Sequence, residues 1–188
     1  VYKRQVVIPI TLGRDKSIKL IQDAYKGNKI IGVVSQKDSS VEDPVYNDLF
    51  KIGTVAQIVK MLKMPDGSTT IIIQGKKRLK LVEELSNDPY LIAKVEEFDE
   101  KRLKKVSKES IALYDSLKDM ALNIIKNSPN IPSEASFAIK NIESPNFLVN
   151  FISSHMNAKV DEKQNMLKEP NINQRAKLLM KHLNKELQ

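Results

Sequence analysis

The sequence predicts an α+β protein. We expect a small, mostly antiparallel and partly open β-barrel that carries one helix, followed by an all-α helical bundle that ends in a long helix. Short β-branched runs separated by turn residues dominate the first half, whereas apolar residues recur at helical spacing through most of the second. A charged stretch at residues 99–108 separates the two patterns. We therefore expect two domains, at residues 1–100 and 101–188.

The first domain begins with a predicted strand, helix and strand. Residues 6–10 and 29–34 are short β-branched runs. Between them, residues 15–27 place apolar side chains at helical spacing and end in glycine. The polar residues 35–50 predict a surface loop, and residues 53–64 resume a strand pattern.

The stretch MLKMPDGSTTIIIQGKKRLKL, residues 61–81, has two interpretations. Its GKKR segment resembles a phosphate-binding loop, but it lacks the first glycine and the hydroxyl residue of a P-loop, and no helix pattern follows. Pro65 to Gly67 is turn chemistry between two apolar runs. We therefore expect a β-hairpin, with Gly75 at a bulge in its second strand, and a further strand at residues 90–98.

The second domain is predicted to be helical. Residues 110–127 carry an apolar stripe with the i, i+3, i+4 rhythm. Ser133 is the expected start of a short helix, and Ser144-Pro145 supplies the preferred cap and first residue of the next. Asp161 is the expected cap of another short segment. The final helix, at residues 172–188, is still in progress at the last residue, which predicts truncation.

The charge balance leaves a nucleic-acid partner open. Lys and Arg outnumber Asp and Glu by 31 to 23, which gives a net charge of +8, and phosphates favour clustered cations. The excess is spread over both halves, and lysine is far commoner than arginine. A solvated lysine surface is therefore the favoured interpretation. Residues 1–5 depart from the strand pattern, and we expect them to be non-native.

No constellation for catalysis or for metal binding is evident in the sequence. Cysteine is absent, and neither His155 nor His182 has a second ligand at metal-binding spacing. The sequence has no Gly-x-Ser-x-Gly elbow, and its paired carboxylates lie in strands or loops. We expect no catalytic residue, no metal and no cofactor in this segment. The lack of a signal segment or a membrane-length apolar run predicts a cytoplasmic protein without membrane contact.

The hairpin supplies the candidate binding residues. Methionine and proline reach up to a turn that would usually be polar, and flexible thioethers suit contact with varied apolar partners. Core packing is the alternative, favoured for the first methionine. The candidates for substrate binding are Met61, Leu62, Met64 and Pro65. A secondary candidate, an electrostatic patch, comprises Lys76, Lys77, Arg78 and Lys80.

Several segments carry a family resemblance. In order and spacing, VVIPITLGRDKSIKLIQDA, DLFKIGTVAQIVKMLKMPDGSTTIIIQGKKRLKL and ESPNFLVNFISSHM resemble the amino-terminal region of bacterial Lon, the ATP-dependent AAA+ serine protease. The resemblance implies a PUA-like first domain and a helical bundle that leads into an ATPase module. It implies that ATP, Mg and the Ser-Lys protease dyad belong to modules after residue 188. The sequence departs from the family pattern before Val6, where a further strand is expected.

The resemblance also implies the function. It predicts a non-catalytic region that binds unfolded or damaged proteins and degradation tags, and that helps the full-length protein to self-associate as a hexamer. One alternative is a nucleic-acid-binding PUA-like module with weak DNA binding. A second is a purely structural role in hexamer assembly, and a third is a standalone recognition protein.

Overall fold

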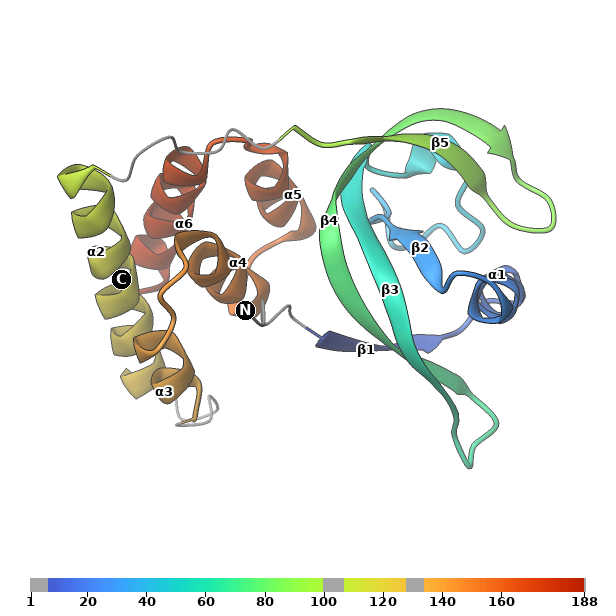
Figure 1. Cartoon of the computed structure of the whole chain (residues 1–188), viewed down its shortest axis with the longest axis horizontal. Helices are drawn as coiled ribbons and strands as arrows, with labels where there is room; N and C mark the ends of the chain where they lie inside the picture. The colour runs from blue at the N-terminus through green and yellow to red at the C-terminus, as the bar shows by residue number, and fades with distance from the viewer. Residues whose placement is uncertain (1–6, 100–106, 128–133, 188) are drawn as a thin grey trace. The chain divides into compact units, whose positions relative to one another are not determined.

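The structure, a computed structural model, describes residues 7–99, 107–127 and 134–187 (Figure 1). Residues 1–5, Ser133 and most of the expected linker lie outside the described residues. The chain divides into two compact units, Val1–Phe98 and Asp99–Gln188. No helix in the described ranges is long and apolar enough to cross a membrane.

Unit 1 is a curled, five-stranded antiparallel sheet with the order β1-β4-β3-β2, in which β5 also pairs with β4. The long strand β4 makes this possible, because β1 pairs with its first third and β5 with its second half. The helix α1 (Asp15–Lys26) and a 3₁₀ turn (Tyr46–Asp48) complete the unit. The strands are β1 (Val7–Leu12), β2 (Ile30–Val33), β3 (Ile52–Lys63), β4 (Thr69–Ser86) and β5 (Ile92–Glu97). The predicted α+β class with a partly open antiparallel barrel is confirmed.

The predicted hairpin joins β3 to β4. The N–H of Gly67 donates to the carbonyl of Met64 at 3.0 Å, and the N–H of Met64 donates to the carbonyl of Ser68 at 2.9 Å. Gly67 has a φ of 85°, a left-handed conformation that glycine adopts without steric cost. The carboxylate of Asp66 accepts bonds from the backbone N–H and the hydroxyl of Ser68, at 2.9 and 2.7 Å. The loop is therefore closed by its own hydrogen bonds.

The GKKR segment lies inside β4 and forms no phosphate-binding loop. Gly75 pairs with Ala56 and Lys77 with Val55, so Lys76 is the extra residue of a β-bulge. The predicted bulge is therefore confirmed, one residue beyond the glycine.

Two apolar clusters stabilise unit 1. The first lies between α1 and the sheet and comprises Ile21, Ala56, Ile58, Ile71 and Ile73. The second comprises Leu49, Leu79 and Leu81, and Leu91 and Ala93 of the last hairpin pack against it. Val95 lies two residues beyond Ala93 and so on the same face of β5, but its side chain is exposed.

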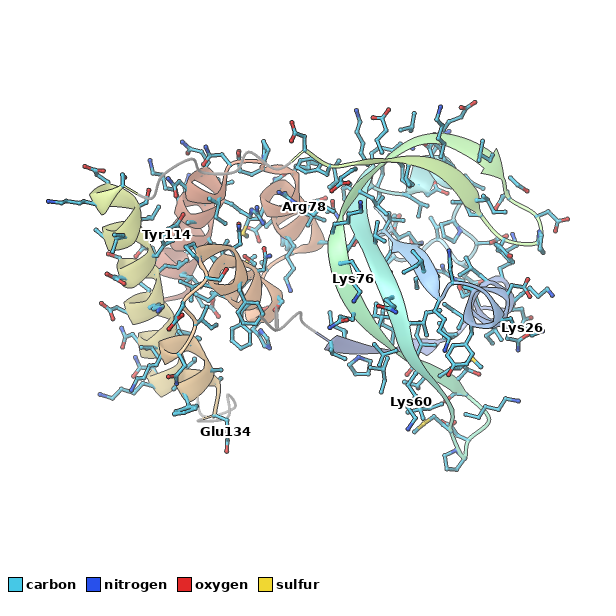
Figure 2. All side chains as sticks on the ribbon, viewed as in Figure 1. Lys26, Lys60, Lys76, Arg78, Tyr114 and Glu134 are labelled. Carbon is cyan, nitrogen blue, oxygen red and sulfur yellow. The ribbon has the colours of Figure 1, made fainter. Side chains whose placement is uncertain are left out.

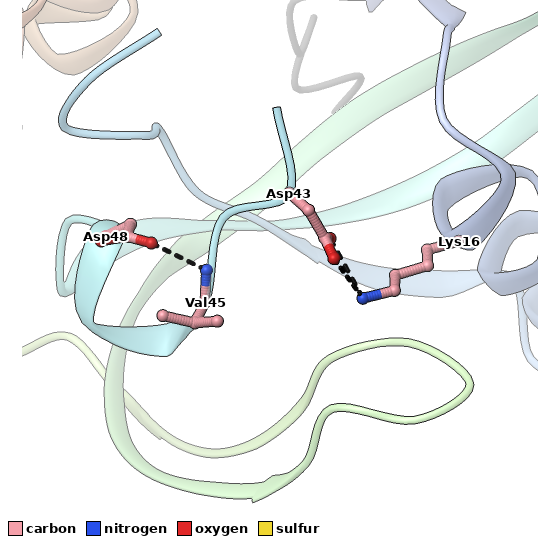
Figure 3. A network of polar contacts seen from close by, with 4 residues as sticks. All are labelled: Lys16, Asp43, Val45 and Asp48. Carbon is pink, nitrogen blue, oxygen red and sulfur yellow. Dashed lines mark hydrogen bonds and ion pairs between the residues drawn. The ribbon is translucent and has the colours of Figure 1, made fainter. Parts of the chain in front are cut away.

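The loop at residues 35–50 is held by polar contacts, shown in part in Figure 3. Lys16 in α1 forms an ion pair with Asp43 at 2.7 Å. The N–H of Val45 donates to the carboxylate of Asp48 at 2.9 Å. The loop is mostly exposed, as predicted, but Leu49 near its end is buried.

Unit 2 is a helical bundle around one apolar core. Its helices in the described ranges are α2 (Lys108–Asn127), α3 (Glu134–Lys140), α4 (Pro145–His155), α5 (Val160–Lys168) and α6 (Ile172–Glu186). The core of the bundle includes Leu117, Leu148, Val149, Ala176 and Leu179.

The helix caps of unit 2 agree with the sequence at one position and differ at another. The hydroxyl of Ser144 accepts the N–H of Phe147 at 3.4 Å, which confirms the predicted cap of α4. The prediction for Asp161 was wrong, because α5 begins after Lys159 and Asp161 lies in its first turn. In the first turn, the carboxylate still interacts favourably with the positive end of the helix dipole.

Candidate functional site

The four candidate residues of the β3–β4 hairpin differ in burial. Met61 pairs with Ile71 and packs against the first cluster of unit 1, so it is half-buried. Leu62 is half-buried as well. Met64 is 43% exposed at the turn, and Pro65 beside it is also exposed. The structure thus places two of the candidates as anchors of the hairpin and the other two at its tip.

A second bulge turns another apolar residue outward on the same hairpin. Ile58 pairs with Ile73 and Lys60 pairs with Ile72, so Val59 is the extra residue of β3. Its side chain is exposed. Sequence reasoning missed Val59 because alternation alone does not reveal a bulge. The only signal in the sequence was the pair of successive β-branched residues Ile58 and Val59, in a strand where apolar and polar residues otherwise alternate in part.

The outer face of the hairpin mixes apolar and polar side chains. Cross-strand partners in a sheet share a face. Leu62 pairs with Thr70, which pairs with Thr11 of β1, and the two threonine hydroxyls lie 3.1 Å apart. In the next row Ile72 lies between Pro9 and Lys60; Figure 2 labels Lys60 near the hairpin. Such a surface can contact an apolar segment and still accept polar groups beside it.

The structure separates the predicted electrostatic patch into exposed lysines and one buried arginine. Lys76 donates to the side chain of Gln74 at 2.6 Å, and Lys77 forms an ion pair with Glu97 at 2.6 Å. Lys80 is exposed. Arg78, which is labelled with Lys76 in Figure 2, is only 6% exposed. Arg78 therefore does not share the solvent-facing surface of the lysines, and DNA binding stays a prediction.

The described residues offer no evident reactive centre. No group of three or more His, Cys, Asp or Glu side chains there could hold a metal ion. His155 contacts the carbonyl of Phe151 and the hydroxyl of Ser154, while His182 faces Glu162 at 3.7 Å. A pocket of about 260 Å³ in unit 2 is lined by α2, by α4 and by the segment that precedes α4, and its lining includes Tyr114. Its lining brings together no nucleophile and base pair.

Solved structures share this fold. The N-terminal domain of Lon protease from the Mycobacterium avium complex superposes with a TM-score of 0.76 at 18% identity, covering 96% of this chain and 90% of that one. A Lon N-terminal domain protein from Xanthomonas campestris superposes with a TM-score of 0.66 at 13% identity, covering 94% and 89%. The architecture is therefore that of a Lon N-terminal domain.

The sequence comparisons establish the family. The chain belongs to the ATP-dependent protease La (LON) substrate-binding domain family, whose model matches residues 5–185. Lon proteases of Flavobacterium johnsoniae, Cytophaga hutchinsonii and Parabacteroides distasonis are 55%, 45% and 39% identical to it. Each alignment covers 97% of this chain and 22% of the relative. The chain thus spans about a fifth of these relatives, and the predicted resemblance is confirmed.

Proposed function

We propose that this chain is the non-catalytic substrate-recognition region of an ATP-dependent Lon protease. It captures exposed apolar segments of unfolded or damaged proteins, including degradation tags, at the tip of the β3–β4 hairpin. The observation that carries the proposal is the exposure of Met64 and Pro65 on a turn that is closed by its own hydrogen bonds. A rigid support lowers the entropic cost of presenting an apolar contact.

Capture at this site is weak and tolerant of sequence. A disordered client loses conformational entropy when it is ordered, which reduces affinity. The unbranched side chain of Met64 adapts to apolar partners of different shape. Such binding suits a first sorting step before delivery to ATPase and protease modules, which supply ATP hydrolysis and peptide cleavage in the whole protein. The bundle of unit 2 contributes to hexamer assembly in the cytoplasm.

A binding measurement with matched variants tests the proposal. The probe is a fluorescent, permanently unfolded, carboxymethylated protein, titrated with this chain. Met64→Ser weakens binding about fivefold, since an apolar contact of about 1 kcal/mol is lost. Ile111→Ser is the control, because Ile111 is similarly exposed, at 51%, but lies in unit 2. Equal binding by both folded variants and the parent chain would refute capture at the tip.

A further inference from the structure

β5 forms an outer edge of the sheet in unit 1. It pairs with β4, and in the described part of the chain no other strand pairs with it. The N–H of Phe98, just after β5, donates to the carbonyl of Arg78 in β4 at 3.2 Å. Because N–H directions alternate along a strand, the N–H groups of Ala93 and Val95 point to the open edge. An edge of this kind can pair with another extended chain.

Two bulges in β4, the strand behind β5, add exposed apolar side chains to this hairpin. The register of β4 against β5 shifts between Leu81 and Glu83 and again between Glu84 and Ser86, so Val82 and Leu85 are extra residues. Leu85 directly precedes Ser86, the cross-strand partner of Ile92. The exposed fractions of Val82, Leu85 and Ile92 are 40%, 61% and 43%. An incoming strand would therefore find open main-chain groups and the exposed side chain of Ile92 on β5, with Val82 and Leu85 one strand further in.

The charge of the β4–β5 hairpin is opposite to that of the chain. Residues 82–97 hold five acidic side chains and one lysine, whereas the whole chain carries +8. Glu97 is paired with Lys77. Within the described ranges, Glu83, Glu84 and Glu96 are exposed and make no ion pair. Complementary charge steers partners and suppresses those of like charge, so this edge favours a cationic segment.

We propose that the open edge of β5 is a strand-addition site for an extended, positively charged, apolar polypeptide segment. The inference rests on the proposed function, because the segment would belong to a client protein. Its main chain bonds to Ala93 and Val95, one row of its side chains packs on Ile92 of β5, and its cations lie in the negative field of the glutamates of the hairpin. Main-chain pairing supplies affinity, and the alternate side chains supply selectivity. The site is separate in sequence from the tip at Met64.

Two labelled peptides test the inference on the full 188-residue chain, one of alternating Val and Lys and one of alternating Val and Glu. The Val-Lys peptide binds, and its affinity falls as salt is raised, while the Val-Glu peptide binds at least about tenfold more weakly. Equal affinity for both peptides would overturn the inference.

Variants at β5 separate main-chain pairing from side-chain packing. Val95→Pro removes an outward N–H, at a position where an edge strand tolerates proline. This variant lowers the affinity for the Val-Lys peptide at least about tenfold. Val95→Ala keeps the N–H and changes the affinity less than about threefold. Ile92→Ser also weakens binding, while Ile111→Ser does not. Unchanged binding by folded Val95→Pro would contradict strand addition.

Amide hydrogen exchange on the unmodified chain provides a readout that needs no variant. The Val-Lys peptide slows exchange at Ala93 and Val95, while Lys94 and Glu96, which already face β4, change little. No added protection at Ala93 and Val95 would overturn the inference. If peptide binding is lost in Met64→Ser and kept in Val95→Pro, this inference fails while the proposed function stands. If unfolded protein does not bind at all, the proposed function fails, and the exchange pattern still decides the edge.

Discussion

Arg78 and Phe98 are joined by both a side-chain and a main-chain contact. The guanidinium carbon of Arg78 lies 4.4 Å from the centre of the Phe98 ring. The N–H of Phe98 donates to the carbonyl of Arg78 at 3.2 Å. Phe98 is the last residue of unit 1, and Arg78 lies inside β4, the longest strand. The two contacts therefore hold the end of the unit against this strand. A buried cation over an aromatic face is worth more than an exposed one.

Replacing the ring tests this contact. Phe98→Leu keeps an apolar side chain but removes the aromatic face, so the free energy of unfolding of unit 1 falls by about 1–2 kcal/mol. Phe137→Leu is the control, because Phe137 is strongly exposed in α3, and its effect stays within about 0.5 kcal/mol. Urea unfolding followed by circular dichroism measures both. Equal effects of the two changes would show that the ring over Arg78 is not stabilising.

Two glycines should respond in opposite ways to alanine. A Cβ on Gly53 would lie 2.4 Å from the carbonyl oxygen of Val33 and 2.5 Å from a methyl group of Val34, so the pairing of β2 with β3 must shift. Gly53→Ala therefore destabilises the protein by about 1–3 kcal/mol. A Cβ on Gly13 meets nothing within 4 Å. Gly13→Ala is neutral or stabilises by up to about 1 kcal/mol. Thermal unfolding of the two variants checks this, and a neutral Gly53→Ala would contradict the packing of β2.

Tyr114 makes the stability of unit 2 depend on alkaline pH. Burial raises the pKa of Tyr114, and the nearby charge of Arg175 opposes the shift only in part. Its hydroxyl bonds to the side-chain oxygen of Asn173. Because the pKa is raised in the folded state, the unfolded chain loses this proton first. Stability is then complete below the ordinary tyrosine pKa of about 10 and falls as pH rises from there toward the folded-state pKa.

Tyr114→Phe isolates this effect. The variant loses about 1 kcal/mol at neutral pH because the bond to Asn173 is gone. Its further loss above about pH 10 is smaller than that of the parent chain. Urea unfolding across this range gives both curves. Parallel curves would mean that Tyr114 does not contribute to the alkaline loss of stability.

The carboxylate of Asp66, in the turn of the β3–β4 hairpin, has a lowered pKa. The Ser68 hydroxyl, followed by the Ser68 N–H, lowers the pKa of Asp66. A lowered folded-state pKa adds stability above the ordinary value near 3.9, and that stability is lost as pH falls through the folded-state pKa. Ser68→Ala moves the carbon-13 titration midpoint of Asp66 upward. Asp38, whose pKa is lowered by Ser40 in the same way, keeps its midpoint and is the internal control. An unmoved Asp66 midpoint would contradict the bonded turn.

Features set by neighbours in sequence could be predicted. The turn at Pro65 to Gly67, the helix that ends before Gly27 and the cap at Ser144 each depend on a few adjacent residues. The amphipathic stripe of α2 likewise needed only periodicity, since Leu117 and its neighbours on the stripe are buried. Local chemistry was enough for these elements, and with them for the fold class.

Features set by strand register could not be predicted. The outward positions of Val59, Val82 and Leu85 come from bulges, and a bulge is defined by the partner strand. The burial of Arg78 depends on Phe98, which reaches it only after the chain has turned through β5. Sequence reasoning therefore gave Arg78 to a surface patch and left the β4–β5 edge unnoticed.

Crosslinking from the hairpin tip tests the central claim most directly. A photoreactive benzoylphenylalanine replaces Met64 in one sample and Ile111 in another, and each is irradiated with a carboxymethylated unfolded protein. Both positions are exposed, so unspecific labelling should be alike. We predict a strong adduct from position 64 that free unfolded protein competes away, and little adduct from position 111. An adduct that forms at position 111 and not at position 64 would contradict recognition by this hairpin.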